Sequence, residues 1–217
     1  MSGTTPKDDV LKDLKKIDVA GVETEILVKG KGPALLYLHG MDGLEGAFKQ
    51  IDLLAESFTV HAPSHPGFGA SALPKGFSTV DDLGYFYQDV LDHFDLKDAT
   101  VAGFSLGGWI AAELLTKSSA RVARAVLAAP LGLKTGDRKS SRVTDIFMLS
   151  PAEAAARMQV SAAEEAPASD VMLERKVRNA EAVTFYGWSP YLYNPKLRQR
   201  LHRIKVPVRV LWGEEDK

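Results

Sequence analysis

Gly103-Phe104-Ser105-Leu106-Gly107-Gly108 is the stretch of sequence that decides the fold. The residues before it, 99–102, form a short apolar run typical of a buried strand, and residues 106–116 have the pattern of a helix. A Gly-x-Ser-x-Gly motif between a strand and a helix predicts a sharp turn with the serine at its tip, because the glycines leave room for a strained backbone. The motif indicates a nucleophile at Ser105, and the helix N-terminus behind it favours developing negative charge.

Outward from this turn, apolar runs alternate with helical patterns. Residues 17–28 predict a hairpin that leads into a sheet. Strands buried on both faces are predicted at 34–38, 58–62, 99–102 and 122–129. Helices are predicted between them at 44–56, 79–94 and 106–116, the second of which opens with a capping-box spacing from Ser78 to Asp81. Strands that alternate with helices indicate an α/β fold with a mostly parallel sheet and helices on both faces.

This alternation stops after Pro130. Residues 134–194 show no convincing strand and instead predict helices, one of which begins at Ser150, so we interpret them as an inserted helical cap. Residues 1–133 are then the N-terminal part of the core, and residues 195–217 return to it through a helix at 195–203 and a buried strand at 206–212.

The cap contains two sets of side chains that could contact a substrate. We interpret its aromatic residues as packing residues rather than as the lining of a pocket: Phe185, Tyr186, Trp188, Tyr191 and Tyr193. Its arginines could grip a substrate carboxylate, but solvated helix faces account for most of them: Arg138, Arg142, Arg157, Arg175 and Arg178.

His39-Gly40-Met41-Asp42-Gly43 follows the first buried strand. A backbone N–H just after that strand can pair with the N–H of Leu106 to hold an oxyanion, so we predict Met41 and Leu106 as the two donors. The predicted substrate contacts are Gly40, Asp42, which is also a candidate loop cap, and Phe104. We interpret His39 as a hydrogen-bonded brace of the loop, and His61 and His65 as structural.

Trp212-Gly213-Glu214-Glu215-Asp216 follows the last predicted strand. Open α/β sheets gather their sites at the carboxyl ends of their strands, so a carboxylate here is well placed to orient a catalytic histidine. We predict Asp216 as that acid, with Glu214 and Glu215 as substitutes.

In their order and spacing, these motifs resemble the α/β-hydrolase superfamily from about residue 17 to residue 217. The resemblance implies a serine nucleophile at Ser105, an acid at Asp216, oxyanion donors at Met41 and Leu106, and a cap over the pocket. It implies no cofactor and no metal. The serine argues against close similarity to haloalkane dehalogenases and epoxide hydrolases, which place aspartate at the same turn.

The triad histidine should follow the acid in this superfamily, and the sequence contains no histidine after His202. His202 precedes the last predicted strand and should lie at the wrong end of the sheet. We therefore expect the chain to be a fragment of a longer hydrolase that lacks one more strand and helix.

Composition narrows the partners. A formal net charge of −1 gives no reason to expect nucleic acid or a membrane surface, and a small-molecule substrate fits better. The absence of cysteine, of a signal peptide in residues 1–16 and of any long apolar run fits a soluble cytoplasmic protein. Oligomeric state cannot be predicted from these features.

Three functions remain open at this point. The first is hydrolysis of an ester or related acyl substrate through an acyl-enzyme at Ser105. The second is hydrolysis of a carbon–carbon bond, as in aromatic degradation, with the same serine and different polar groups from the cap. The third is a small-molecule receptor on the same fold that does not turn its ligand over.

Overall fold

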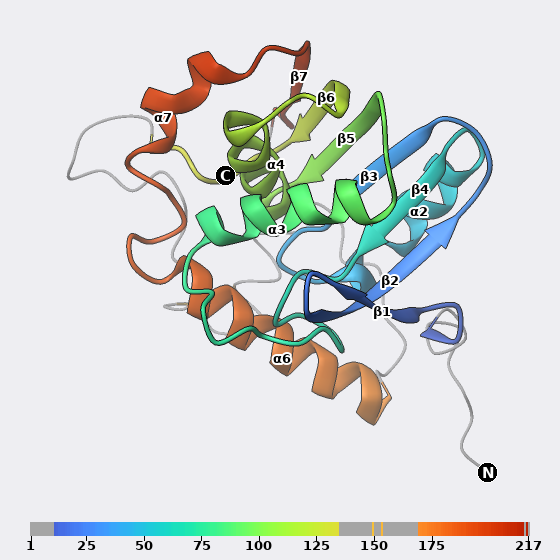
Figure 1. Ribbon diagram of the computed structural model, residues 1–217. Helices are drawn as coiled ribbons and strands as arrows, with labels where there is room; N and C mark the ends of the chain where they lie inside the picture. The colour runs from blue at the N-terminus through green and yellow to red at the C-terminus, as the bar shows by residue number, and fades with distance from the viewer. Residues whose placement is uncertain (1–10, 135–148, 150–152, 154–168, 215, 217) are drawn as a thin grey trace.

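The computed structural model describes residues 11–134, 149, 153, 169–214 and 216. Within them, one sheet has the strand order β1-β2-β4-β3-β5-β6-β7 (Figure 1). The strands are β1 (Lys15–Val19), β2 (Val22–Lys29), β3 (Ala34–Leu38), β4 (Thr59–Pro63), β5 (Ala99–Phe104), β6 (Val122–Ala128) and β7 (Val208–Leu211). The α/β fold with a mostly parallel sheet is confirmed.

The predicted hairpin forms the antiparallel edge of this sheet. β1 and β2 turn at Ala20-Gly21, where both residues have positive φ, and β2 continues antiparallel to β4. From β4 onward every neighbouring pair of strands is parallel. β3 and β4 are almost entirely buried, as expected for strands covered on both faces.

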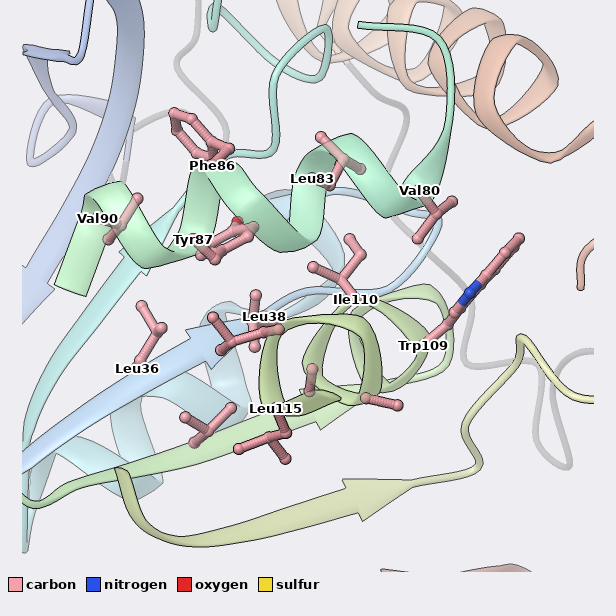
Figure 2. Close-up of a cluster of buried hydrophobic side chains, with 14 of the residues drawn as sticks. Leu36, Leu38, Val80, Leu83, Phe86, Tyr87, Val90, Trp109, Ile110 and Leu115 are labelled. Atoms are coloured by element: carbon pink, nitrogen blue, oxygen red, sulfur yellow. The ribbon is translucent and has the colours of Figure 1, made fainter. Parts of the chain in front are cut away.

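Helices cover both faces of the sheet. They are η1 (Leu44–Gly46), α2 (Phe48–Ala55), α3 (Val80–His93), α4 (Leu106–Lys117), α6 (Asp170–Gly187), α7 (Leu197–Arg200) and η3 (Leu201–Arg203). Figure 2 shows how α3 and α4 direct side chains such as Tyr87 and Ile110 toward each other and toward Leu36 and Leu38 of β3. A second apolar cluster on the other face joins α2 to the sheet through residues such as Ile51.

The strand order creates a topological switch point between β3 and β5. β3 lies between β4, which follows it in the chain, and β5, so the loops after β3 and β5 leave the sheet in opposite directions around one point. Leu38 and Gly103 are register partners, so both loops start from the same level of the sheet. This carboxyl edge is where open α/β sheets bind their ligands.

Two local predictions need correction. The capping box of α3 lies one residue later than predicted, because the Asp82 carboxylate accepts hydrogen bonds from the N–H groups of Ser78 and Thr79 at 2.9 and 2.8 Å. β7 does form, but its four residues are exposed rather than buried, with Val210 57% exposed. Within the described residues, β7 pairs with β6 alone, and an apolar pattern reveals a strand without revealing what covers it.

Other predictions lie beyond the described residues. The helix expected at Ser150, and the cap arginines Arg138, Arg142 and Arg157, fall outside them. The division into core, cap and returning core stays a prediction. No helix in the described segments has the length and apolar character needed to span a bilayer.

The capping box provides a first test of the fold. Replacing Asp82 with alanine removes three hydrogen bonds to the start of α3 and should lower the free energy of unfolding by about 1 kcal/mol. Urea denaturation measures the change. Asp89→Ala on the same helix is the control and should lose much less, because Asp89 makes no hydrogen bond within the described part of the chain. Equal losses for the two variants would contradict the assignment.

Candidate active site

Ser105 sits on a strained backbone between β5 and α4. Its φ of 52° and ψ of −113° lie outside the regions that non-glycine residues favour. The neighbouring chain holds it there: the N–H of Ser105 donates to the Ala128 carbonyl at 2.9 Å, and its carbonyl accepts from the N–H groups of Trp109 and Leu131 at 3.2 and 3.1 Å. Such strain costs about 1–3 kcal/mol and persists where the surrounding structure over-determines it.

Glycines allow the turn to pack against the end of β3. A Cβ atom on Gly103 would lie 2.4 Å from the Gly107 carbonyl oxygen. A Cβ atom on Gly107 would lie 2.0 Å from the carbonyl oxygen of Leu38. Both obstacles are backbone atoms, which cannot rotate away. The glycines of the motif are therefore required by close approach of main chain to main chain.

The loop after β3 brings the predicted oxyanion donors to the serine. Gly40 to Gly43 form a turn closed by the Gly43 N–H donating to the Gly40 carbonyl at 3.2 Å, and Met41 lies inside this turn. A Cβ atom on Gly40 would be 3.6 Å from the Cβ of Ser105, so the turn lies beside the nucleophile. Among the described residues, nothing accepts a hydrogen bond from the N–H of Met41 or of Leu106.

His39 and His65 brace this loop from below. His39 donates from Nδ1 to the Gly40 carbonyl at 2.7 Å and accepts at Nε2 from the His65 N–H at 3.0 Å. His65 donates from Nε2 to the His39 carbonyl at 3.0 Å, and its Nδ1 pairs with the Tyr87 hydroxyl. The two rings stack with centroids 3.5 Å apart. All four ring nitrogens are occupied, which confirms His39 as a brace.

Burial keeps this pair neutral. Both side chains have no exposed surface, and desolvation lowers the pKa of His39 to about 4. Desolvation also lowers the pKa of His65 well below its ordinary value, with the neighbouring His39 acting in the same direction.

None of the five histidines in the sequence is placed to take a proton from Ser105. His61 of β4 and His93 of α3 both pack against the ring of Phe94, with centroids 4.8 Å away in each case. His202 is exposed, donates to the Gln199 carbonyl at 2.8 Å and precedes β7, at the opposite edge of the parallel sheet. Within the described residues, the Ser105 hydroxyl has no hydrogen-bond partner.

The remaining predicted site residues are placed to different degrees. Phe104 is 47% exposed beside the nucleophile, and its ring edge would be 3.1 Å from a Cβ on Gly40. The Asp42 side chain instead lies against Gly46. Asp216 follows β7 at the carboxyl edge of the sheet and is exposed. The roles of these residues stay predictions.

Sequence reasoning missed a polar cluster that joins α6 to the loops around the site. Arg175 is 11% exposed and forms ion pairs with Glu25 of β2 and Glu45 of η1, whose side chains are 8% and 7% exposed. Arg178 donates to the Gly67 carbonyl at 3.3 Å and to that of Ser71 at 2.6 Å. Arg175 therefore does not lie on a solvated helix face, whereas Arg178 is exposed and still donates to two backbone carbonyls. The unusual acidic residue in an otherwise buried β2 was the available signal.

The aromatic residues of the predicted cap differ in burial. Tyr186 is buried, and its hydroxyl donates to the Pro66 carbonyl at 3.1 Å, as a packing residue would. Phe185 and Trp188 are 46% and 60% exposed. The described residues contain no group of three or more metal-ligating side chains.

Comparison with known proteins identifies a matching sequence family and several similar proteins. The sequence profile described as "Alpha/beta hydrolase family" matches residues 35–217. The dihydrolipoyllysine-residue acetyltransferase component of the acetoin cleaving system of Cupriavidus necator is 28% identical, over 98% of this chain and 61% of its own length. The 3-oxoadipate enol-lactonase 2 of Acinetobacter baylyi is 27% identical, over 85% of this chain and 72% of its own.

A solved structure shows the same fold. Naproxen esterase from Bacillus subtilis superimposes with a TM-score of 0.71 at 18% identity, covering 93% of this chain and 74% of the esterase. The chain thus spans about three fifths of the Cupriavidus relative and about three quarters of the esterase.

Proposed function

The chain belongs to the alpha/beta hydrolase family, and from that premise we propose that the protein hydrolyses an ester or related acyl compound through an acyl-enzyme at Ser105. One observation carries the proposal. Ser105 holds a positive φ at a strand-to-helix turn, beside two backbone N–H groups that have no acceptor within the described residues. This combination presents a hydroxyl and an oxyanion site to the same space.

The chemistry follows from these positions. The Ser105 oxygen attacks the acyl carbon, and the carbonyl electron pair moves to the oxygen, where the N–H groups of Met41 and Leu106 donate to it. Collapse of this intermediate expels the alcohol, which takes up the proton lost by Ser105. Water then attacks the acyl-enzyme, releases the acid and restores the serine. Phe104 and Gly40 would contact the acyl or alcohol portion.

The proposal requires an imidazole to carry that proton. None of the five histidines in the sequence reaches Ser105, and Asp216 is the acid that would orient an imidazole placed beside it. No cofactor or metal is needed for the reaction. The names of two similar proteins, an enol-lactonase and an esterase, support an ester as the substrate class.

Fluorophosphonate labelling tests the proposal. The full-length protein should gain one adduct, mapped by peptide mass spectrometry to Ser105, because the reagent phosphonylates serines activated in an oxyanion site. Ser105→Ala should abolish the adduct, while Ser64→Ala should retain it, since Ser64 is fully buried and cannot reach the reagent. A folded protein that resists labelling, or labelling that survives Ser105→Ala, would exclude an acyl-enzyme at this residue.

A receptor is the second candidate, favoured by the absence of any histidine beside Ser105. In this case the pocket binds a small molecule without turning it over. Product formation from a saturating ester such as p-nitrophenyl acetate, lost in Ser105→Ala, would decide against a receptor. Binding of the same ester without product would favour it.

A further inference from the structure

Asn179 of α6 connects the polar cluster to the loop that carries the proposed oxyanion donor. The residue is 2% exposed, and both its amide nitrogen and its amide oxygen form hydrogen bonds within the protein. The Nδ2 group donates to the Asp42 carbonyl and to Glu45 Oε2, both at 3.1 Å. The Oδ1 atom accepts from the Gly69 N–H at 2.9 Å. One amide side chain therefore connects α6 with two other segments, residues 42–45 and the loop at Gly69.

The backbone at Gly43 is shaped to receive this side chain. Gly43 has a φ of 76°, and a Cβ atom there would lie 2.3 Å from Asn179 Nδ2 and 2.3 Å from Glu45 Oε2. Only a glycine leaves room for the amide to reach the Asp42 carbonyl, which belongs to the peptide group that joins Asp42 to Gly43.

The turn that contains Met41 is consequently held at two of its carbonyls. The Gly40 carbonyl accepts from the Gly43 N–H and from His39 Nδ1, and the Asp42 carbonyl accepts from Asn179. Each bond fixes the plane of one peptide unit. The Met41 N–H belongs to the same planar peptide unit as the Gly40 carbonyl, so its direction is set by the hydrogen bonds at that carbonyl. One of these bonds comes from the Gly43 N–H, which belongs to the peptide unit whose Asp42 carbonyl accepts from Asn179.

Arg175 fixes the position of the α6 backbone at Asn179 relative to the loop. It lies one helical turn before Asn179 on α6, and its ion pairs tie the helix to β2 and η1. Arg178 also binds the core, but it reaches the carbonyls of Gly67 and Ser71, in a different loop. The two contacts of α6 are thus separable by mutation.

We propose that Asn179 is a positioning residue for the oxyanion site, holding the Gly40–Gly43 turn so that the Met41 N–H faces the acyl oxygen. This inference rests on the proposed function. α6 then acts in catalysis through the loop it binds rather than through contact with the substrate. Donors that stabilise charge only in the transition state lose their effect steeply when displaced.

The test measures how fast fluorophosphonate labels Ser105 in the full-length protein at a temperature where each variant is folded by circular dichroism. Asn179→Ala and Asn179→Asp should both reduce the second-order rate constant about tenfold or more. The aspartate keeps the volume and the acceptor for the Gly69 N–H but removes the donor to Asp42, so it serves if the alanine variant does not fold. Arg178→Met is the matched control and should keep the parent rate, although it removes two hydrogen bonds from the same helix.

Hydrogen–deuterium exchange gives a second readout that does not depend on activity. The peptide containing residues 40–46 should exchange faster in the Asn179 variants than in Arg178→Met. Labelling at the parent rate with unchanged exchange would overturn the inference and leave the proposed function intact. A parent protein that is not labelled at all would remove the proposed function and the inference with it.

Discussion

Gly107→Ala should lower the free energy of unfolding by about 3 kcal/mol. The added Cβ would lie 2.0 Å from the Leu38 carbonyl oxygen and 2.5 Å from that of His39, and neither backbone atom can move without shifting β3 against α4. Alanine gains about 1 kcal/mol over glycine in a helix, which is too little to offset the clash. Urea denaturation monitored by tryptophan fluorescence measures the loss.

The matched control for this substitution is Gly76→Ala. A Cβ atom on Gly76 meets no other atom within 4 Å, so this variant should unfold at the parent urea concentration. A Gly107→Ala protein as stable as Gly76→Ala would show that α4 does not approach β3 as closely as described, and the oxyanion geometry would need revision.

The second large effect is a loss of stability in mild acid caused by the His39 and His65 pair. The folded pKa of His39 is lowered from 6.5 to about 4, so folding favours its neutral form. That contribution is fully present above pH 6.5 and is lost as the pH falls toward 4, because the unfolded chain binds the proton first. His39 alone should remove about 3 kcal/mol over this window, and the lowered pKa of His65 adds to the loss.

Urea titrations at several pH values between 7 and 4.5 measure this dependence. His39→Gln should flatten the acid loss relative to the parent protein, whereas His202→Gln should leave it unchanged because His202 is exposed. Stability that stays level from neutral pH to pH 4.5 would contradict a buried neutral pair. Carboxylates with lowered pKa, such as Asp81, lose their contribution at lower pH and do not account for the onset near pH 6.5.

The local pattern predicts most of the sheet and the turn at Ser105. Strands at 34–38, 58–62 and 122–129 are confirmed within one or two residues, since a short apolar run has few other ways to be buried. The glycines around Ser105 indicate the turn because few other residues allow the close approach that the structure shows at Gly103 and Gly107.

Long-range contacts are what the sequence does not reveal. Arg175 and Glu25 are 150 residues apart, and no pattern in either segment predicts their contact. Arg175 has the spacing of a surface helix residue, and only the docking of α6 on β2 makes it buried. The prediction that β7 is buried is wrong for the same reason. Burial depends on which layers pack against a strand, and the residues of the strand alone do not show this.

The pairing of Leu38 with Gly103 has a consequence for how such a site can change over time. Backbone hydrogen bonds between β3 and β5 set the spacing of the two proposed donors, so the side chains of Met41 and Leu106 take no part in holding charge. Under the proposed function, substitutions at position 41 would change the side chain beside the acyl group while the donor stays where the sheet puts it. In the proposed site, the side chain at position 41 would affect selectivity, whereas the backbone N–H of the same residue would stabilise charge.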